Sequence, residues 1–245
     1  MAEVVVMPKF FTKPDYINNK ELRIIGDDVS HISKVLRMSS GDNIIVCDGE
    51  GNDYDATIVS ISKTEVIAEI TGKYVCDAEP SVNVTLYQAL PKQGKMEYII
   101  QKNIELGVNK IIPVYTKRCV VKPSDKTERW SKVAESAAKQ CGRGIIPQVM
   151  PAVSFNEAIE QMKEYDLALM PYECEEENGL KKVLQSSNYK NVSIFIGPEG
   201  GFDLKEVEAA LSAGVKTVTL GKRILRTETA ASAVLPIIMY ENDEM

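Results

Sequence analysis

The chain has 245 residues, of which 44% are hydrophobic and 26% charged, so it can bury a sizeable core. Its net charge of −6 argues against indiscriminate binding to nucleic acid. It contains a single histidine, His31, which excludes paired-histidine metal sites and leaves one ring for any Ser-His or Cys-His nucleophile. We therefore expect no metal site and a chemistry that needs no metal.

The five cysteines are widely spaced and include no CxxC pair. This arrangement fits neither a zinc ribbon nor a disulfide framework, and it is typical of a reducing compartment. The amino-terminal residues lack the basic start and long apolar core of a signal peptide. The longest mostly apolar run, 230–240, is too short to span a bilayer. These features predict a cytoplasmic protein.

Residues 1–74 are predicted to form a small β-barrel domain that carries one helix. β-Branched runs with partial alternation predict strands at 21–24, 43–48, 54–61 and 64–70. Between the first two strands, residues 27–38 place apolar side chains at helical spacing. Residues 76–81 have the composition of a linker, so a second domain is expected over 75–245.

From residue 82 onward, strand patterns alternate with helix patterns, which predicts a parallel α/β sheet. The predicted strands are 82–89, 110–115, 146–149, 166–170, 192–196 and 217–220. The predicted helices are 95–107, 127–142, 154–165, 179–187, 203–214 and 227–240. An acidic run at 173–177 is expected to be a solvated loop. Because open parallel sheets bind ligands beyond the carboxyl ends of their strands, functional residues are expected in the loops that follow strands.

Two of these loops are unusual. The first, GPEGG at 197–201, precedes a helix that Asp203 and Glu206 are expected to cap together. The second, within LGKRILRTETA at 220–230, concentrates cations ahead of a helix that Thr227 is expected to cap. Neither matches a phosphate-binding loop. Taken alone, the first is also consistent with a plain glycine-rich turn, and the second with a solvated basic loop.

Together the two motifs resemble the carboxyl-terminal signature of the SPOUT methyltransferases. Within them, the chain resembles the family that methylates N3 of uridine in small-subunit ribosomal RNA. The resemblance covers nearly the whole chain, since MPKFF (7–11), HISKVLRMSSGD (31–42) and the blocks at 95–119 and 128–149 also match in order. Residue 9 departs from the family pattern, because lysine stands where arginine is expected.

The resemblance implies a PUA-like β-barrel followed by a parallel sheet with a carboxyl-terminal trefoil knot, in a homodimer. It also implies that S-adenosylmethionine binds mainly to the backbone of three loops. The cofactor residues carried over from the family are Met170, Pro171, Tyr172, Ile196, Gly197, Pro198, Gly200, Gly201, Leu220, Gly221, Ile224, Leu225 and Thr229.

The activity implied by the resemblance is methyl transfer to a weakly acidic ring nitrogen. A cation near the developing imide anion would assist this reaction, and Arg226 is the candidate. Glu199 is the candidate proton acceptor or base-edge contact. Both assignments rest on the positions of the residues in the two loops.

The expected partner is small-subunit ribosomal RNA, gripped by basic residues. Residues 92–143 hold 12 Lys or Arg against 5 Asp or Glu, although a solvated helix face would have the same composition. The RNA-binding candidates are Lys9, His31, Lys34, Arg37, Lys92, Lys95, Arg118, Lys122, Arg129, Arg143 and Arg223. The alternatives are a SPOUT enzyme acting on another RNA, a non-catalytic ribosome-assembly factor, and a nicotinamide- or phosphate-binding enzyme. The last lacks its glycine fingerprint.

Overall fold

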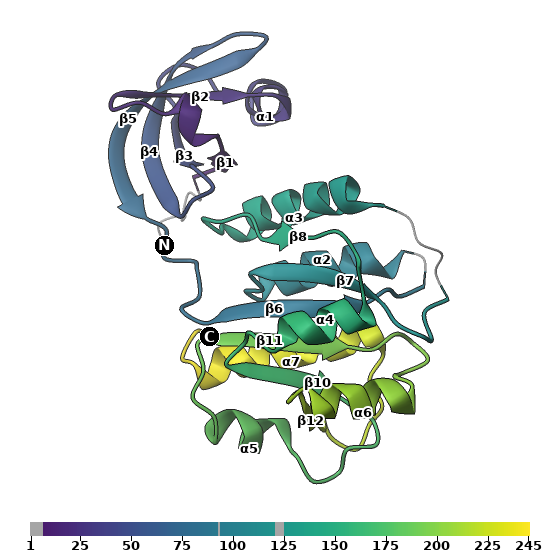
Figure 1. Ribbon diagram of the computed structural model, residues 1–245. Coiled ribbons are helices and arrows are strands. Elements are labelled where there is room, and N and C mark those ends of the chain that lie inside the picture. Colours follow the sequence, from purple (N-terminus) through teal and green to yellow (C-terminus); the bar gives the residue numbers. More distant parts are fainter. Residues whose placement is uncertain (1–6, 93, 121–124) are drawn as a thin grey trace. The chain divides into compact units, whose positions relative to one another are not determined.

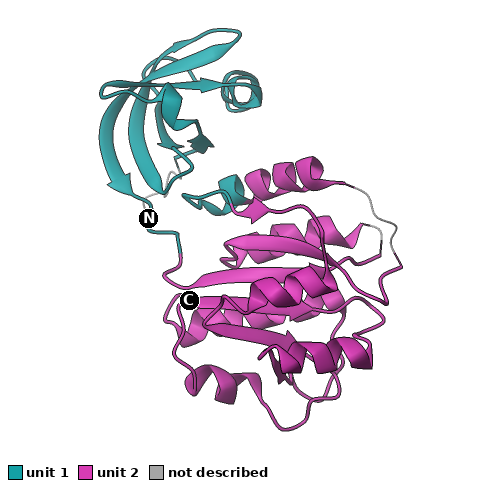
Figure 2. Ribbon diagram, in the orientation of Figure 1, with its two compact units in different colours: residues 1–79, 138–146 teal, residues 80–137, 147–245 magenta. Residues whose placement is uncertain are grey.

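Figure 1 shows the computed structural model, which describes residues 7–92, 94–120 and 125–245. The chain divides into two compact units (Figure 2). Unit 1 comprises residues 1–79 and 138–146, and unit 2 comprises residues 80–137 and 147–245. The predicted domain boundary between residues 74 and 75 stays a prediction.

Unit 1 is built on a five-stranded sheet of order β1-β3-β4-β5-β2. Its strands are β1 (Lys9–Phe11), β2 (Glu21–Ile25), β3 (Asn43–Cys47), β4 (Asn52–Ile61) and β5 (Glu65–Val75). β1 pairs with β3 in parallel, and the other neighbours are antiparallel. The alternating side chains of these strands enclose a core that includes Leu22, Ile44 and Val66.

The helix predicted at 27–38 is shorter than expected. After a 3-10 turn at η1 (Pro14–Tyr16) and strand β2, helix α1 (Asp27–Ser30) passes into a π-helical turn, η2 (His31–Val35). Arg37 then adopts a φ of 54°, which ends the helical path. Val29 and Ile32 are buried as expected, but Val35 is 65% exposed. The wider π turn shifts the apolar stripe out of helical register.

Residues 138–146 belong to unit 1 although they follow residue 137 of unit 2 in the chain. The guanidinium of Arg143 is buried and pairs with the Glu79 carboxylate at 2.6 Å. The carbonyl of Gly144 accepts from the amide of Gly51 at 3.1 Å. Gly144 has no room for a side chain, since a Cβ there would lie 2.5 Å from the Cβ of Cys76. These contacts hold the segment against the end of β5.

Unit 2 contains a parallel sheet of order β12-β10-β11-β6-β7-β8, with β9 paired to β7. Its strands are β6 (Asn83–Ala89), β7 (Lys110–Tyr115), β8 (Gln148–Val149), β9 (Val153–Ser154), β10 (Leu167–Pro171), β11 (Asn191–Ile196) and β12 (Lys216–Val218). The helices that follow these strands are α2 (Lys95–Glu105), α3 (Thr127–Cys141, shared with unit 1), α4 (Phe155–Met162), α5 (Leu180–Gln185), α6 (Leu204–Ser212) and α7 (Thr227–Glu241).

The helices cover both faces of this sheet (Figure 1). α7 packs on α2, α5, β6 and β11, while α4 packs on α6 and β7. Phe155, Phe195 and Phe202 meet in the core beneath α4 and α6, with the rings of Phe195 and Phe202 at 5.0 Å. The predicted class, a small β-rich unit followed by a parallel α/β sheet, is confirmed.

Candidate active site

The three loops predicted to hold the cofactor follow neighbouring strands. β10 lies between β12 and β11, and all three are parallel. Pro171 at the end of β10 is in register with Val218 at the end of β12. The carboxyl ends therefore meet at one edge of the sheet, and the loops after them emerge together.

Each glycine of the GPEGG loop has a packing role of its own. A Cβ on Gly197 would lie 3.1 Å from the ring of Phe202, and a Cβ on Gly200 would lie 3.3 Å from the Cβ of Arg118. Gly201 has a φ of +66°, and a Cβ there would lie 2.5 Å from a carboxylate oxygen of Glu173. Glycine is thus favoured at all three positions, most of all at Gly201, where the positive φ strains any L side chain.

A buried hydroxyl ties this loop to two other elements. The Oγ1 of Thr227 donates to the carbonyl of Gly197 at 2.7 Å and accepts from the Nε2 of Gln88 at 2.9 Å. Thr227 was expected to cap α7, but Arg226 occupies that position and Thr227 is the first helical residue. Its hydroxyl instead joins the ends of β6 and β11 to the start of α7.

Glu199 is held by two donors from outside its loop. Its carboxylate accepts from the backbone amide of Lys92 at 3.0 Å and lies 3.2 Å from the Nζ of Lys95. The same Nζ lies 3.0 Å from the carboxylate of Glu228. Burial raises the pKa of Glu199, but its own amide, the Lys92 amide and Lys95 together lower it below the ordinary carboxyl value. Glu199 is therefore ionised and a weak proton acceptor, and its contacts position the loop.

The loop after β7 packs on the other side of the glycines. The Arg118 guanidinium donates to the carbonyl of Gly200 at 2.9 Å. The Lys117 Nζ pairs with Asp203 at 2.8 Å, and the Lys117 amide donates to Glu206 at 2.8 Å. The predicted capping box of Asp203 and Glu206 is present, so these two carboxylates serve both the helix cap and the neighbouring loop.

The acidic run at 173–177 is partly structural, contrary to the expectation of a solvated loop. The Glu175 carboxylate accepts from the Thr217 hydroxyl at 2.5 Å and from the amides of Glu177 and Asn178. The hydrogen bond from Thr217 is the main reason that the pKa of Glu175 falls to about 2. This anchor fixes the segment after β10 to β12.

The loop after β12 presents its side chains to solvent. Ile224 is 87% exposed, so the fold itself leaves this aliphatic side chain uncovered. Arg226 is also exposed, and among the described residues its guanidinium has no hydrogen-bond or ion-pair partner. Burial raises the pKa of Glu228, but its own amide, Lys95 and, to a smaller extent, the charge of Arg226 lower this pKa below the ordinary carboxyl value. Arg226 is thus a free cation beside the three loops.

The RNA-binding candidates fall into several environments. Two are held in ion pairs within unit 1 and are unsuited to a phosphate contact: the partly buried Lys9 pairs with Asp53 at 2.7 Å, and the buried Arg143 pairs with Glu79. Lys95 is half-buried between two carboxylates, and Lys122 lies outside the described residues. The exposed candidates are His31, Lys34, Arg37, Lys92, Arg118, Arg129 and Arg223.

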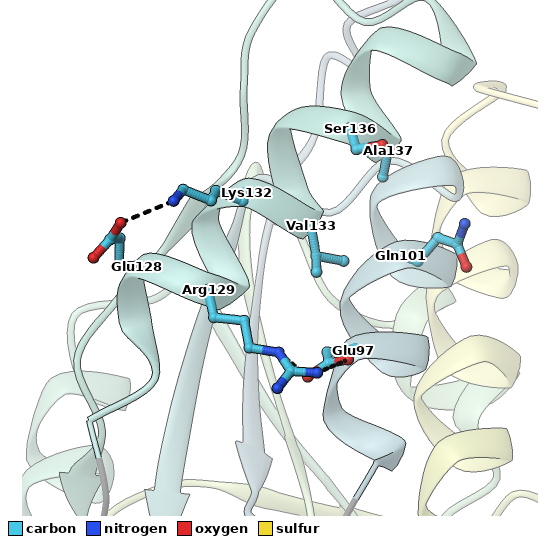
Figure 3. A pocket seen from close by; sticks show the side chains of 8 residues that line it. All are labelled: Glu97, Gln101, Glu128, Arg129, Lys132, Val133, Ser136 and Ala137. Carbon is cyan, nitrogen blue, oxygen red and sulfur yellow. Dashed lines mark hydrogen bonds and ion pairs between the residues drawn. The ribbon is translucent and has the colours of Figure 1, made fainter. Parts of the chain in front are cut away.

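A surface groove of about 620 Å³ lies between α2 and α3 (Figure 3). The Arg129 guanidinium pairs with Glu97 across it at 2.8 Å, and Lys132 pairs with Glu128 along α3 at 2.9 Å. None of the three loops predicted to hold the cofactor contributes to its lining, so it is not the candidate cofactor site.

Within the described ranges, no group of three or more His, Cys, Asp or Glu side chains is placed to hold a metal ion. No helix of that part of the chain is both long and apolar enough to cross a membrane.

Comparison with known proteins connects this geometry to a family. The family model of an RNA methyltransferase domain matches residues 78–239, and that of an RNA methyltransferase PUA domain matches residues 24–71. A Bacillus subtilis protein named ribosomal RNA small subunit methyltransferase E is 36% identical, over 97% of this chain and 98% of that one. The chain belongs to the ribosomal RNA small subunit methyltransferase E family.

Solved structures agree with this membership. The family member from Neisseria gonorrhoeae, bound to S-adenosylmethionine, superposes with a TM-score of 0.86 at 33% identity, covering 96% of this chain and 98% of that chain. A methyltransferase from Legionella pneumophila, in complex with the same cofactor, gives 0.87 at 28% identity, covering 97% and 98%. The predicted family and enzyme class are confirmed.

Some residues of the site were not predicted as site residues from the sequence. Gln88 and Thr217 belong to strands, Lys117 to a short loop, and Glu175 to an acidic run. A polar residue at the buried end of a strand, as Gln88 is, was the one available hint.

Proposed function

We propose that this protein transfers a methyl group from S-adenosylmethionine to N3 of a uridine in small-subunit ribosomal RNA. The observation that carries the proposal is the meeting of the loops after β10, β11 and β12 at one edge of the sheet, with the exposed cation Arg226 at the end of one of them. The names of the relatives, and the cofactor bound to two of the solved neighbours, support the same activity.

The residues of the three loops fit a cofactor held by backbone groups. Gly200 and Gly201 keep the backbone bare where Arg118 and Glu173 approach, and Ile224 offers an aliphatic surface that the fold does not bury. The residues proposed to hold the cofactor are Met170, Pro171, Tyr172, Ile196, Gly197, Pro198, Gly200, Gly201, Leu220, Gly221, Ile224, Leu225 and Thr229. When bound, S-adenosylmethionine supplies a methyl group already activated by a positively charged sulfur.

We assign Arg226 the role of stabilising charge on the uracil. N3 must lose its proton, which we assign to solvent water, and negative charge then develops on the imide and its carbonyl oxygens until N3 forms its bond to the methyl carbon. An exposed guanidinium is suited to stabilise that charge. Glu199 holds the GPEGG loop in place and is available for a base-edge contact, while its lowered pKa makes it a poor general base.

Exposed cations are proposed to contact the RNA. In unit 1 these are His31, Lys34 and Arg37 on and after the π-helical turn. In unit 2 they are Lys92, Arg118, Arg129 and Arg223. Contacts of this kind give an affinity for RNA that falls with salt concentration. The shape of the folded RNA then determines which RNA is bound.

The oligomeric state, the knot and the compartment are part of the same proposal. α7 exposes Ile237 and Tyr240, and a second copy of the chain would cover such a surface in a homodimer. Sedimentation at micromolar concentration tests this, with a monomer counting against it. The trefoil knot and the cytoplasmic location stay predictions.

The decisive experiment maps modified uridines in small-subunit RNA by mass spectrometry, from cells with and without the protein. We expect one N3-methyluridine to disappear with the gene and to return when purified protein and S-adenosylmethionine are added to the unmodified subunit. Methylation of a different RNA would show that the proposed substrate is wrong. Calorimetry that shows no binding of S-adenosylmethionine would favour a non-catalytic RNA-binding factor.

A further inference from the structure

Lys95 holds two carboxylates that come from different parts of unit 2. It is the first residue of α2, Glu199 lies in the loop after β11, and Glu228 lies in the first turn of α7. Its Nζ is 3.2 Å from Glu199 and 3.0 Å from Glu228, with the three side chains between 17% and 31% exposed. The cluster is therefore screened less by solvent than a surface ion pair.

Local structure does not explain a lysine at this position. A cation in the first turn of a helix is disfavoured by the helix dipole, so Lys95 does not stabilise α2 by itself. The tertiary contact supplies the reason, because Glu199 and Glu228 lie within 3.2 Å of the same nitrogen. Without the lysine, these two like charges would repel each other and separate the elements that carry them.

Both carboxylates lead directly to the site. Glu199 stands between Pro198 and Gly200 of the loop proposed to hold the cofactor. Glu228 is two residues beyond Arg226, and the positive charge of Arg226 helps to lower the pKa of Glu228. The chain of charges thus runs from the GPEGG loop through Lys95 and Glu228 toward Arg226.

We propose that Lys95 is a positioning residue for methyl transfer, which sets the GPEGG loop relative to Arg226 by bridging Glu199 and Glu228. The proposal rests on the proposed function of these loops. It replaces the expectation that Lys95 contacts RNA, because its ammonium is already shared by two carboxylates.

The test compares Lys95→Met and Lys95→Arg with a control on the same helix. Lys102→Met is the control, since among the residues that the structure describes Lys102 pairs only with Glu105, one helical turn further on. We expect Lys95→Met to lower the single-turnover rate roughly 100-fold at saturating RNA and cofactor, as small misplacements of reacting groups do. RNA affinity should stay within about 3-fold. Lys95→Arg should recover most of the rate, and Lys102→Met should match the wild type.

Two results would overturn the proposal. One is an unchanged single-turnover rate in Lys95→Met. The other is a loss of RNA affinity with a normal rate at saturating RNA, which would make Lys95 an RNA ligand. Glu228→Gln removes one arm of the bridge and provides a milder variant if Lys95→Met does not fold; a normal rate in it would count equally against the proposal. Failure of the proposed function would show differently, as absence of cofactor binding or methylation in the wild type.

Discussion

The hydroxyl of Thr227 donates a 2.7 Å hydrogen bond to the carbonyl of Gly197, which joins the start of α7 to the GPEGG loop. The same oxygen accepts from Gln88, whose side chain is fully buried. One hydroxyl thus hydrogen-bonds to the end of β6, 139 residues away in the chain, and to the GPEGG loop, 30 residues away.

Replacing Thr227 with valine should therefore destabilise unit 2 and weaken cofactor binding. The change keeps the shape but removes the acceptor of one Gln88 amide N–H and the hydroxyl donor to the Gly197 carbonyl, at a cost of about 1–3 kcal/mol. Thr227→Ser keeps the hydroxyl and is the matched control. Urea unfolding and calorimetric titration with S-adenosylmethionine measure both effects, and equal behaviour of the two variants would contradict this role.

Gly201→Ala should also impair the loop. Its φ of +66° is strained for any L side chain, and the Glu173 carboxylate, 2.5 Å from the new Cβ, would have to move aside, so we expect a loss of about 1 kcal/mol and a weaker affinity for the cofactor. Gly179→Ala is a suitable comparison, because a Cβ there meets nothing within 4 Å and its φ is −63°. Near-neutral behaviour of Gly201→Ala in denaturation would argue against the described loop conformation.

Arg226→Ala should lower the single-turnover rate of methylation about 10²- to 10³-fold, the usual effect of removing one donor to a developing anion. Arg226→Lys keeps the charge but not the planar fork, so it should lie between the alanine variant and the wild type. The rates are compared at saturating RNA and cofactor. A near-normal rate in Arg226→Ala would remove Arg226 from the chemistry.

The Glu175 anchor predicts a specific pH dependence of stability. Because the folded state lowers the pKa of Glu175 from 4.5 to about 2, its stabilising contribution is complete above pH 4.5 and is lost as the pH falls toward 2. Glu175→Gln should be less stable than wild type at pH 7, by about 1–2 kcal/mol, and the difference should shrink below pH 4.5. Glu176→Gln, at an exposed neighbour, should change stability by less than about 0.5 kcal/mol at any pH. A pH-independent difference for Glu175→Gln would contradict the ionised anchor.

The local pattern of the chain predicted most of the fold. The switch near residue 82 from two-residue alternation to strand–helix alternation located the six main strands of unit 2, because burial on both faces of a parallel sheet leaves continuous apolar runs. Two short strands were not predicted, because β1 and β9 have only three and two residues, too few to show a period. The π-helical turn was missed because its wider winding breaks the spacing on which the helix prediction relied.

The sequence by itself determined the family, the class of fold and the two loops that carry the candidate site, because those depend on contiguous residues and their order. Only the tertiary structure decided what the charged side chains do. Lys9 and Arg143 have the same local character as exposed cations, yet each pairs away from solvent with an acid 44 or 64 residues distant, and Lys95 bridges acids more than 100 residues away. The energy of a charge depends on its solvent exposure and its partners, and both are set when distant elements pack together.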